Sequence, residues 1–567
     1  MNDFRRTFLW VIFGFSLVML WDQWQVHNGR QATFFPSPKV NATATASPTK
    51  GASDAAVPTS AAGSQAPQSN AQAPAGAARA SGVDNWVTVQ TDVLKLSFDP
   101  VGGSLVRAEL LKHLDANAHD KPVVLMDDQA NHIYVAQSGL IAAGSAAPMP
   151  NHKSNMHFEG DRTLADGQGQ VKFSFTSDVM GGVQLIKHYT IARGQYVVQV
   201  EHEIKNLGNA NIEPQVYLQL VRDDSKPVGE SSFYSTFTGP AIYSQEKKYQ
   251  KIDFEDIQKD KAVFEKTSPL GYVAMVQHYF ASAWLVKEDK QRDFYARKLD
   301  QNLYAVGMLV KAGTVAPGQT AKQSTQLFVG PQEEKKLEAL YPGLELVKDY
   351  GWLTILAKPL YWLLDEIHAV VGNWGWSIVL LVVIIKAMFY WLNAKAYRSM
   401  AKMKAINPRI TELRERHKSN PQQMQMEMMR IYREEKVNPL GGCLPIAIQI
   451  PVFIALYWVL LSTVEMRNAS WLYVTDLARP DALFGVIPGI HLPLGPLPIL
   501  MTLSSLLQTW LNPTPPDPMQ AKLMWIMPLM FGVMFFFFPS GLVLYWLTNN
   551  LLSIAQQWVI NRRLGLN

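Results

Sequence analysis

The sequence is poor in the residues that build metal and redox sites. Its only cysteine is Cys443, so no intramolecular disulfide can form, and cysteine usage says nothing about the redox compartment. Histidine occurs 12 times but never in a metal-ligand spacing such as H-E-x-x-H. The phosphate-binding pattern G-x-x-x-x-G-K-[ST] is also absent. We therefore expect no metal or nucleotide cofactor.

The excess of positive over negative charge is small as well. The net charge is only +5, and it is spread along a chain of 567 residues, which does not suggest nucleic acid as a direct partner. Hydrophobic residues make up 48% of the sequence, and they gather in its last third. Composition and length together indicate a multi-domain membrane protein.

The first 85 residues predict an anchor followed by a linker. In residues 1–24, Arg5 and Arg6 precede a short apolar run, which is typical of either a cleaved signal peptide or a signal anchor. Large residues such as Trp21 and Trp24 follow the run where a cleavage site needs small ones, which favours the uncleaved transmembrane anchor. The two arginines place the N-terminus in the cytoplasm, so the following segment is exported. Residues 25–85 are rich in Ala, Ser and Pro and predict a flexible linker.

Residues 86–330 change to short runs with period-two alternation, as in Tyr196–Ile204, separated by Gly, Asn and Asp. This pattern predicts antiparallel strands and a large exported β-sandwich, with turns at the Gly-Gly pairs 102–103 and 181–182. We interpret His188, His202 and His278 as strand residues rather than catalytic ones. A binding or spacing module is favoured, and a membrane-tethered carbohydrate enzyme is the alternative.

Residues 331–374 lead back to the membrane. Apolar residues recur at helical spacing from Trp352 to Ile367, which predicts an amphipathic helix on the outer membrane surface. The alternative is the first half of a longer buried helix, but Gly372-Asn373 argues against continuity.

Residues 375–394 predict the second transmembrane helix, and its apolar sequence from 376 to 393 contains Lys386. A lysine at mid-membrane costs roughly 2.5–3.5 kcal/mol, and no acidic residue lies one helical turn away to offset the cost. The ammonium either extends to the interface or faces a polar cavity made by other helices.

Residues 395–437 carry eleven lysines and arginines against five glutamates, which places this segment in the cytoplasm. Two apolar stripes on either side of Ser419-Asn420-Pro421 predict a hairpin of two helices, with Asn420 as an N-cap. The hairpin either contacts partner proteins or only fixes the topology. Its expected contact residues are Met403, Ile406, Ile410, Leu413, Met424 and Met428.

Residues 438–561 predict four more transmembrane helices, at about 440–461, 494–511, 523–538 and 542–560. Together with the anchor and the helix of Lys386 they make six crossings. The cytoplasmic tail, residues 562–567, then places both termini on the same side.

Polar side chains recur on the cytoplasmic halves of these helices. Tyr545, Asn549, Ser553 and Gln556 are spaced i, i+4, i+8 and i+11 and therefore share one face. Polar residues in membrane helices often only hydrogen-bond between helices. Their common depth with Lys386, Gln449 and Gln508 favours a cavity that is open to the cytoplasm.

Several motifs resemble the YidC/Oxa/Alb family of membrane protein insertases. They are the runs 436–453, beginning Lys-Val-Asn-Pro-Leu-Gly-Gly-Cys, and 538–549, Phe-Pro-Ser-Gly-Leu-Val-Leu-Tyr-Trp-Leu-Thr-Asn. Residues 271–281 resemble the large periplasmic domain of Gram-negative members. The resemblance covers about residues 352–563 and implies a bacterial inner-membrane protein that is not an enzyme, with a periplasmic β-supersandwich.

The resemblance implies a hydrophilic groove that integrates and helps fold membrane proteins, alone or with the Sec translocon. Nascent membrane proteins and membrane lipids are the implied partners, with the ribosome and signal recognition components at the hairpin. The family usually has arginine where this chain has Lys386, and often a second tyrosine where it has Trp546. A secondary transporter is a further alternative, but that class predicts internal repeats, and the sequence has none.

Overall fold

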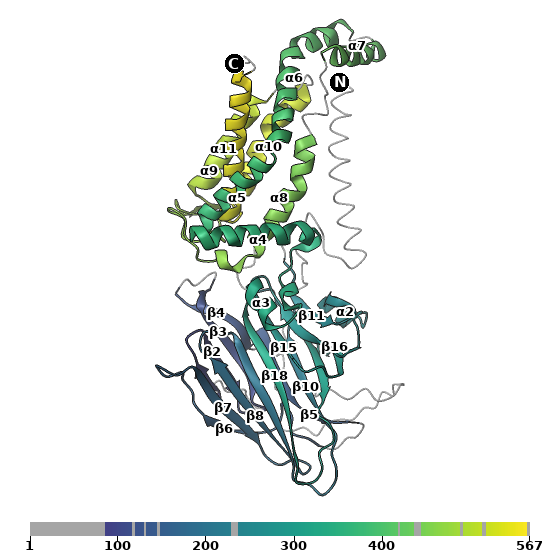
Figure 1. Ribbon diagram of the computed structural model, residues 1–567, viewed down its shortest axis with the longest axis vertical. Helices are drawn as coiled ribbons and strands as arrows, with labels where there is room; N and C mark the ends of the chain where they lie inside the picture. Colours follow the sequence, from purple (N-terminus) through teal and green to yellow (C-terminus); the bar gives the residue numbers. More distant parts are fainter. Residues whose placement is uncertain are drawn as a thin grey trace. The chain divides into compact units, whose positions relative to one another are not determined.

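The computed structural model describes residues 85–115, 120–129, 132–143, 148–227, 236–417, 420–435, 444–487, 492–512 and 518–563. The predicted anchor, the linker and residues 564–567 of the tail lie outside them. The described chain forms two compact units that divide between Lys348 and Asp349 (Figure 1). The first unit is built from strands and the second from helices.

Two antiparallel nine-stranded sheets form the β unit, which confirms the predicted β-sandwich. In spatial order, the first sheet contains β1 (Val87–Gln90), β2 (Leu94–Asp99), β3 (Ser104–Leu114), β4 (Pro122–Gln129), β5 (His132–Ala142), β10 (Pro214–Arg222), β17 (Leu303–Lys311), β16 (Arg292–Asp300) and β13 (Thr267–Ser268). The second contains β12 (Lys248–Lys251), β11 (Gly239–Ser244), β14 (Gly271–Val276), β15 (Phe280–Leu285), β18 (Thr320–Pro331), β9 (Val197–Asn206), β8 (Val183–Ala192), β7 (Gln170–Ser177) and β6 (Met156–Gly160). The helices α2 (Phe254–Gln258) and α3 (Glu334–Leu340) belong to this unit too.

Alternation explains strands such as β7, β8 and β9, whereas β5, β10, β14, β15 and β17 are buried on both faces. Every second residue of β8 is buried, because successive side chains of a strand point to opposite faces. His188 and His202 lie in β8 and β9 as predicted. The prediction for His278 is wrong: it lies in the short reversal between β14 and β15, where its ring stacks on Tyr279. Both glycine pairs form turns with positive φ, as predicted.

A lysine is buried between the two sheets. Lys187 is 0% exposed, and its ammonium donates to the carbonyls of Gly102 and Ser138, each at 2.7 Å. Its cross-strand neighbour His202 is also fully buried, and the His202 ring Nε2 lies 2.9 Å from Ser138 Oγ. Burial lowers the pKa of Lys187 to about 7, and burial beside Lys187 lowers the pKa of His202 to about 3.

The helical unit contains eight α-helices within its described residues (Figure 1). They are α4 (Thr354–Val371), α5 (Trp374–Met388), α6 (Tyr390–Arg416), α7 (Pro421–Glu434), α8 (Leu444–Ser462), α9 (Pro496–Leu511), α10 (Pro518–Phe535) and α11 (Ser540–Arg563). Each predicted helical segment between 354 and 563 therefore has a counterpart.

The predicted amphipathic helix is α4, and it ends at Gly372, whose left-handed conformation stops the helix. One face, with Ala357 and Leu364, is buried in the apolar core that the bundle helices share. The opposite face keeps large apolar side chains exposed, among them Ile355 at 87% and Trp362 at 59%. A helix that is apolar on both sides fits an element lying between a bundle and lipid.

The predicted transmembrane stretch over 376–393, which contains Lys386, is divided between two helices in the structure. It breaks at Phe389, and α5 meets α6 at an angle of 66°. At the break, the Gln556 side chain donates to the Tyr390 carbonyl at 3.2 Å, and such an inserted side chain is a recognised cause of a kink. Among the described helices this bent pair, Trp374–Met388 with Tyr390–Ser399, meets the length and hydropathy expected of a membrane span, and none does so alone. The count of six crossings stays a prediction.

The hairpin prediction is met by the second part of α6 and by α7. The Asn420 side chain accepts from the Gln423 backbone N–H at 3.2 Å, and Pro421 follows as the first helical residue, which confirms the N-cap. Ile406, Ile410 and Ile431 form the buried seam of the hairpin. Of the expected contact residues, Met403, Leu413 and Met428 pack against that seam, and Met424 is half-buried on α7.

Candidate functional site

The bundle contains a chain of polar side chains centred on α11. The ammonium of Lys386, which is 8% exposed, donates to Ser553 Oγ at 2.7 Å. Ser553 Oγ in turn donates to the Asn549 carbonyl at 2.7 Å, one turn earlier on α11. Within the described residues, the lysine thus pairs with a hydroxyl of another helix and not with a carboxylate.

The same face of α11 contacts two further helices. Gln449 Nε2 on α8 donates to Asn549 Oδ1 at 3.0 Å, so these two sequence-predicted residues meet. Gln556 reaches the Tyr390 carbonyl at the bend before α6. Gln449, Asn549 and Gln556 are half-buried. The helical spacing therefore placed Asn549, Ser553 and Gln556 on one face, and the structure brings Ser553 to Lys386, Asn549 to Gln449 and Gln556 to the bend.

Three other predicted site residues lie outside this chain of hydrogen bonds. Tyr545 is 4% exposed and stacks on Phe453, with ring centroids 5.9 Å apart. Trp546 is half-buried and packs edge-on against Phe453 with centroids 4.3 Å apart. Gln508 is half-buried on α9. The two aromatic residues thus form the apolar border of the polar chain, towards the end of α11 that begins at Ser540.

A second polar contact, which the sequence reading missed, joins α9 to α11. Asn550 Nδ2 donates to Ser504 Oγ at 3.2 Å and to Ser505 Oγ at 2.9 Å. Two turns further along α11, Gln557 Nε2 donates to the Leu511 carbonyl at 3.2 Å. The signal was available, because Asn550 and Gln557 directly follow Asn549 and Gln556 and so form a parallel stripe.

Connecting loops cap the helices at the other end of the bundle. Asp481 Oδ2 accepts from the Leu497 backbone N–H and from the Tyr473 hydroxyl, both at 2.9 Å, and so caps the start of α9. Burial and the Asp481 carboxylate raise the pKa of Tyr473. A Cβ on Gly495 would lie 2.0 Å from the Asp481 carboxyl carbon, so this close approach requires glycine. Asp481 and Gly495 therefore fix the loop against the start of α9.

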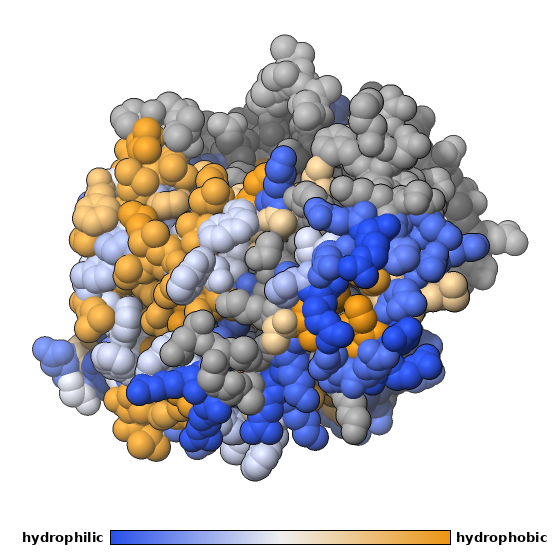
Figure 2. All heavy atoms as spheres, turned by 90° about the horizontal axis from the view of Figure 1, so that it is seen from above, coloured by the Kyte–Doolittle hydropathy of each residue, from blue (hydrophilic) through white to orange (hydrophobic). Residues whose placement is uncertain are grey.

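Hydrophobic and hydrophilic residues lie on different sides of the surface that carries α7. Seen end-on, hydrophobic residues gather on one side, and hydrophilic residues gather on the side where α7 lies (Figure 2). Large apolar side chains are exposed along α9 and α10: Leu500, Leu503, Leu507, Trp510, Trp525, Ile526, Leu529, Met530 and Val533. Exposed apolar surface on this scale marks contact with lipid or with another protein.

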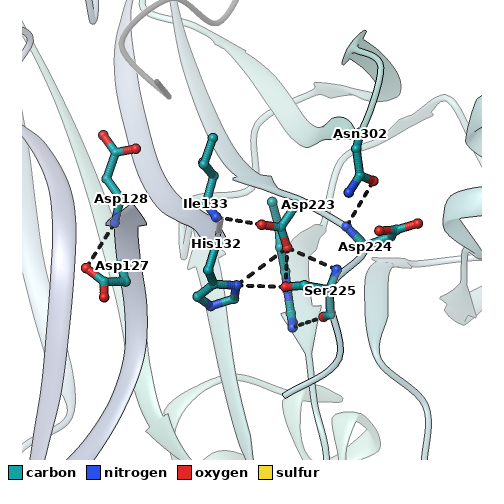
Figure 3. Close-up of polar contacts among 9 residues, drawn as sticks. Asp127, Asp128, His132, Ile133, Asp223, Asp224, Ser225 and Asn302 are labelled. Atoms are coloured by element: carbon teal, nitrogen blue, oxygen red, sulfur yellow. Dashed lines mark hydrogen bonds and ion pairs between the residues drawn. The ribbon is translucent and has the colours of Figure 1, made fainter. Parts of the chain in front are cut away.

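The β unit holds serine, histidine and aspartate side chains in one cluster, at the ends of β5 and β10 (Figure 3). His132 Nδ1 lies 2.7 Å from Ser225 Oγ and 3.5 Å from Asp223 Oδ1, so one ring nitrogen faces both groups. The Ser225 hydroxyl itself donates to Asp223. A nucleophilic serine needs the histidine between itself and the aspartate, and this geometry lacks that order. The Asp223 carboxylate instead accepts from the Ile133 and Ser225 backbone N–H groups. It thereby links the end of β10 to the start of β5.

One group in the described residues has donor atoms close enough to hold a metal. His188, Glu201 and Glu203 present ligand atoms within 4.8 Å of one another on β8 and β9. Lys322 already lies 2.8 Å from the Glu201 carboxylate, and Lys205 lies 3.3 Å from that of Glu203. The arrangement is therefore that of an ion-pair network on a partly exposed sheet surface.

The strand unit and the helical unit correspond to two known protein families, and those matches place the chain in the class of membrane protein insertases, which are not enzymes. The family models that match are the YidC periplasmic domain, over residues 86–363, and the 60Kd inner membrane protein, over residues 366–566. The chain belongs to the YidC family of membrane protein insertases.

Relatives match along the whole chain. The membrane protein insertase YidC of Janthinobacterium sp. (strain Marseille) is 50% identical over 100% of both chains. That of Cupriavidus metallidurans is 53% identical over 99% of this chain and 98% of the relative. A crystal structure of an active YidC insertase is 19% identical with a TM-score of 0.38, and covers 83% of this chain and 92% of its own, a likeness too weak to carry a conclusion.

Proposed function

We propose that the polar chain of Lys386, Ser553, Asn549 and Gln449 is the site at which this insertase receives its substrates. The observation that carries the proposal is the contact between Lys386 and Ser553, in which a buried cation within a largely apolar helix has, among the described residues, a hydroxyl and no carboxylate as its partner. Such residues are costly in a membrane and are typically retained for function.

The proposed mechanism uses this site to shorten the apolar barrier. An inserting protein must carry a short polar flank across roughly 30 Å of hydrocarbon. Polar groups at intermediate depth hydrate that flank, and the Lys386 ammonium attracts acidic flanks. The apolar segment of the substrate then partitions into lipid, and the membrane potential adds a pull on negative residues. No nucleotide is required.

The proposal includes a topology and partners. The α6–α7 hairpin is cytoplasmic, because it is rich in lysine and arginine. The β unit is then periplasmic, and six crossings place both termini in the cytoplasm. Nascent membrane proteins are the substrates, membrane lipids receive them, and the Sec translocon works beside the chain in some cases. The hairpin, with its exposed Met426 and Met429, is the contact for the ribosome or signal recognition components.

The test is insertion in cells depleted of their own insertase and supplied with this chain. A single-span substrate with a short exported tail, in a neutral and an acidic form, is assayed by protease protection. We expect Lys386→Arg to retain insertion of both forms, and Lys386→Ala to impair the acidic form more than the neutral one. Lys386→Glu should be worst, because it repels the acidic tail.

Matched protein levels are the necessary control, since removing a buried charge can stabilise a protein. Lys386→Gln separates charge from hydration, because it keeps a polar group without the charge. Equal insertion of the acidic substrate by the Ala and Arg variants would show that the charge is not used. Failure of the parent chain to restore any insertion would refute the proposed function itself.

A further inference from the structure

The Ser553 hydroxyl connects its own helix, α11, with two others, α5 and α6. A serine hydroxyl has one donor and two acceptor positions. The donor goes to the Asn549 carbonyl within α11 at 2.7 Å. One acceptor position takes the Lys386 ammonium of α5, and the Tyr397 side chain of α6 interacts with the same hydroxyl. Ser553 is 2% exposed, so water does not compete at its side chain.

These contacts lie on both sides of the bend between α5 and α6. Lys386 precedes the break at Phe389, and Tyr397 follows it. Gln556, one turn beyond Ser553, holds the Tyr390 carbonyl at the break itself. The α11 helix therefore fixes both limbs of the bend, and the second limb continues into the hairpin.

We infer that Ser553 is a positioning residue: it orients the Lys386 ammonium and, through Tyr397, couples that charge to the limb of α6 that carries the hairpin. This inference rests on the proposed function of the Lys386 site. When an acidic flank of a substrate forms an ion pair with the ammonium, Ser553 loses one of its hydrogen-bond partners. The contacts that hold α11 to the bend are then weaker. Arrival of a substrate in the membrane is thereby transmitted to the hairpin.

Alternative partners of Lys386 would weaken the inference, and the described residues offer none with charge. Within the described residues the ammonium donates to Ser553, and the side chains that hydrogen-bond to Ser553 or elsewhere on this face of α11 are neutral: Asn549 and Gln556 of α11, Tyr397 of α6 and Gln449 of α8. Loss of the Ser553 hydroxyl leaves a buried ammonium and a tyrosine hydroxyl without this partner. An interhelical hydrogen bond in a membrane changes an equilibrium by about threefold on average.

The test measures the hairpin directly and does not depend on insertion. Nitroxide labels are placed at Glu412→Cys on α6 and Val559→Cys on α11, both at exposed positions, in a chain whose native cysteine is replaced. Pulsed electron resonance then gives the distance distribution in the purified full chain. We expect a narrow distribution for the parent, a broader one for Ser553→Ala, and a narrow one for Ser553→Thr, which keeps the hydroxyl.

Thr548→Ala is the matched control, because the Thr548 hydroxyl lies on the same helix and donates to the Leu544 carbonyl within it. It should leave the distribution narrow. In the insertion assay, Ser553→Ala should lower the ratio of acidic to neutral substrate inserted by about threefold, and Ser553→Thr should preserve it.

The two arms separate the inference from the function on which it rests. An unchanged distance distribution in Ser553→Ala refutes the coupling, even where Lys386→Ala impairs acidic substrates as proposed. An unchanged substrate ratio in Ser553→Ala refutes the positioning role. A parent chain that fails to insert any substrate refutes the proposed function, while the distance measurement still decides whether Ser553 holds the bend.

Discussion

The buried Lys187 makes the stability of the β unit depend on pH in a predictable direction. The pKa of its ammonium falls from 10.5 to about 7 on folding, because the side chain is buried between two sheets with carbonyls as its partners. Between these two pKa values the unfolded chain binds more protons than the folded one. Stability therefore rises with pH across this window, and the full cost of the buried charge is present below pH 7.

The magnitude follows from the shift. One pKa unit corresponds to about 1.4 kcal/mol, so the lysine contributes a gain of about 2 kcal/mol between pH 7 and pH 9. In Lys187→Met the gain should disappear. The variant also leaves the Gly102 and Ser138 carbonyls without this donor, which lowers stability by an amount that does not depend on pH. The difference between the two pH profiles, rather than either absolute value, isolates the charge.

The assay is urea unfolding of residues 86–348, a compact unit with its own core, at pH 7, 8 and 9. Lys172→Met on the neighbouring strand β7 is the control, because this lysine is exposed and its removal should keep the slope of the parent. A slope for Lys187→Met equal to that of the parent would refute the assignment of the pH dependence to Lys187.

Three further predictions concern the helical unit and the topology. Gln449→Leu and Asn549→Leu should show a coupling energy of about 0.6 kcal/mol in a double-mutant cycle of unfolding, and additive effects would mean that the hydrogen bond between them contributes nothing. Asp481→Ala should lower the stability of the purified chain by about 1 kcal/mol in thermal unfolding, with Asp481→Asn less affected, because Asp481 caps α9; equal losses would argue against the cap. In a cysteine-free chain, an impermeant maleimide should label Ser324→Cys in intact spheroplasts, and Glu412→Cys only after lysis; the reverse pattern would invert the proposed topology.

Local patterns predicted the elements of this fold. Strand alternation located the β-sandwich, and it also placed Lys187 among the buried positions of β8, although the sequence reading did not use that signal. The cap at Asn420 followed from residue types alone, because an Asn-Pro pair at a helix start has a specific local geometry. The order of the strands could not be predicted, since β5, β10 and β17 pair across long stretches of sequence.

The candidate site, too, was predictable from the sequence only in part. Helical spacing put Asn549, Ser553 and Gln556 on one face of α11, because that depends on one helix only. Their partners depend on how helices pack, so the contact of Ser553 with Lys386 was visible only in the structure. The break at Phe389 was missed for a related reason: it contains no proline or glycine, and the side chain that accompanies it belongs to a distant part of the sequence.

The most direct test of the central claim is whether a nascent membrane segment touches the polar chain of α11. A photo-crosslinking amino acid is placed in turn at Asn549, at Gln449 and, as the control, at Leu500, which is 49% exposed on α9. A ribosome-bound single-span substrate is then presented in membranes and irradiated. We expect strong adducts at Asn549 and Gln449 and weak ones at Leu500. Equal capture at all three positions would contradict a defined substrate site on this face.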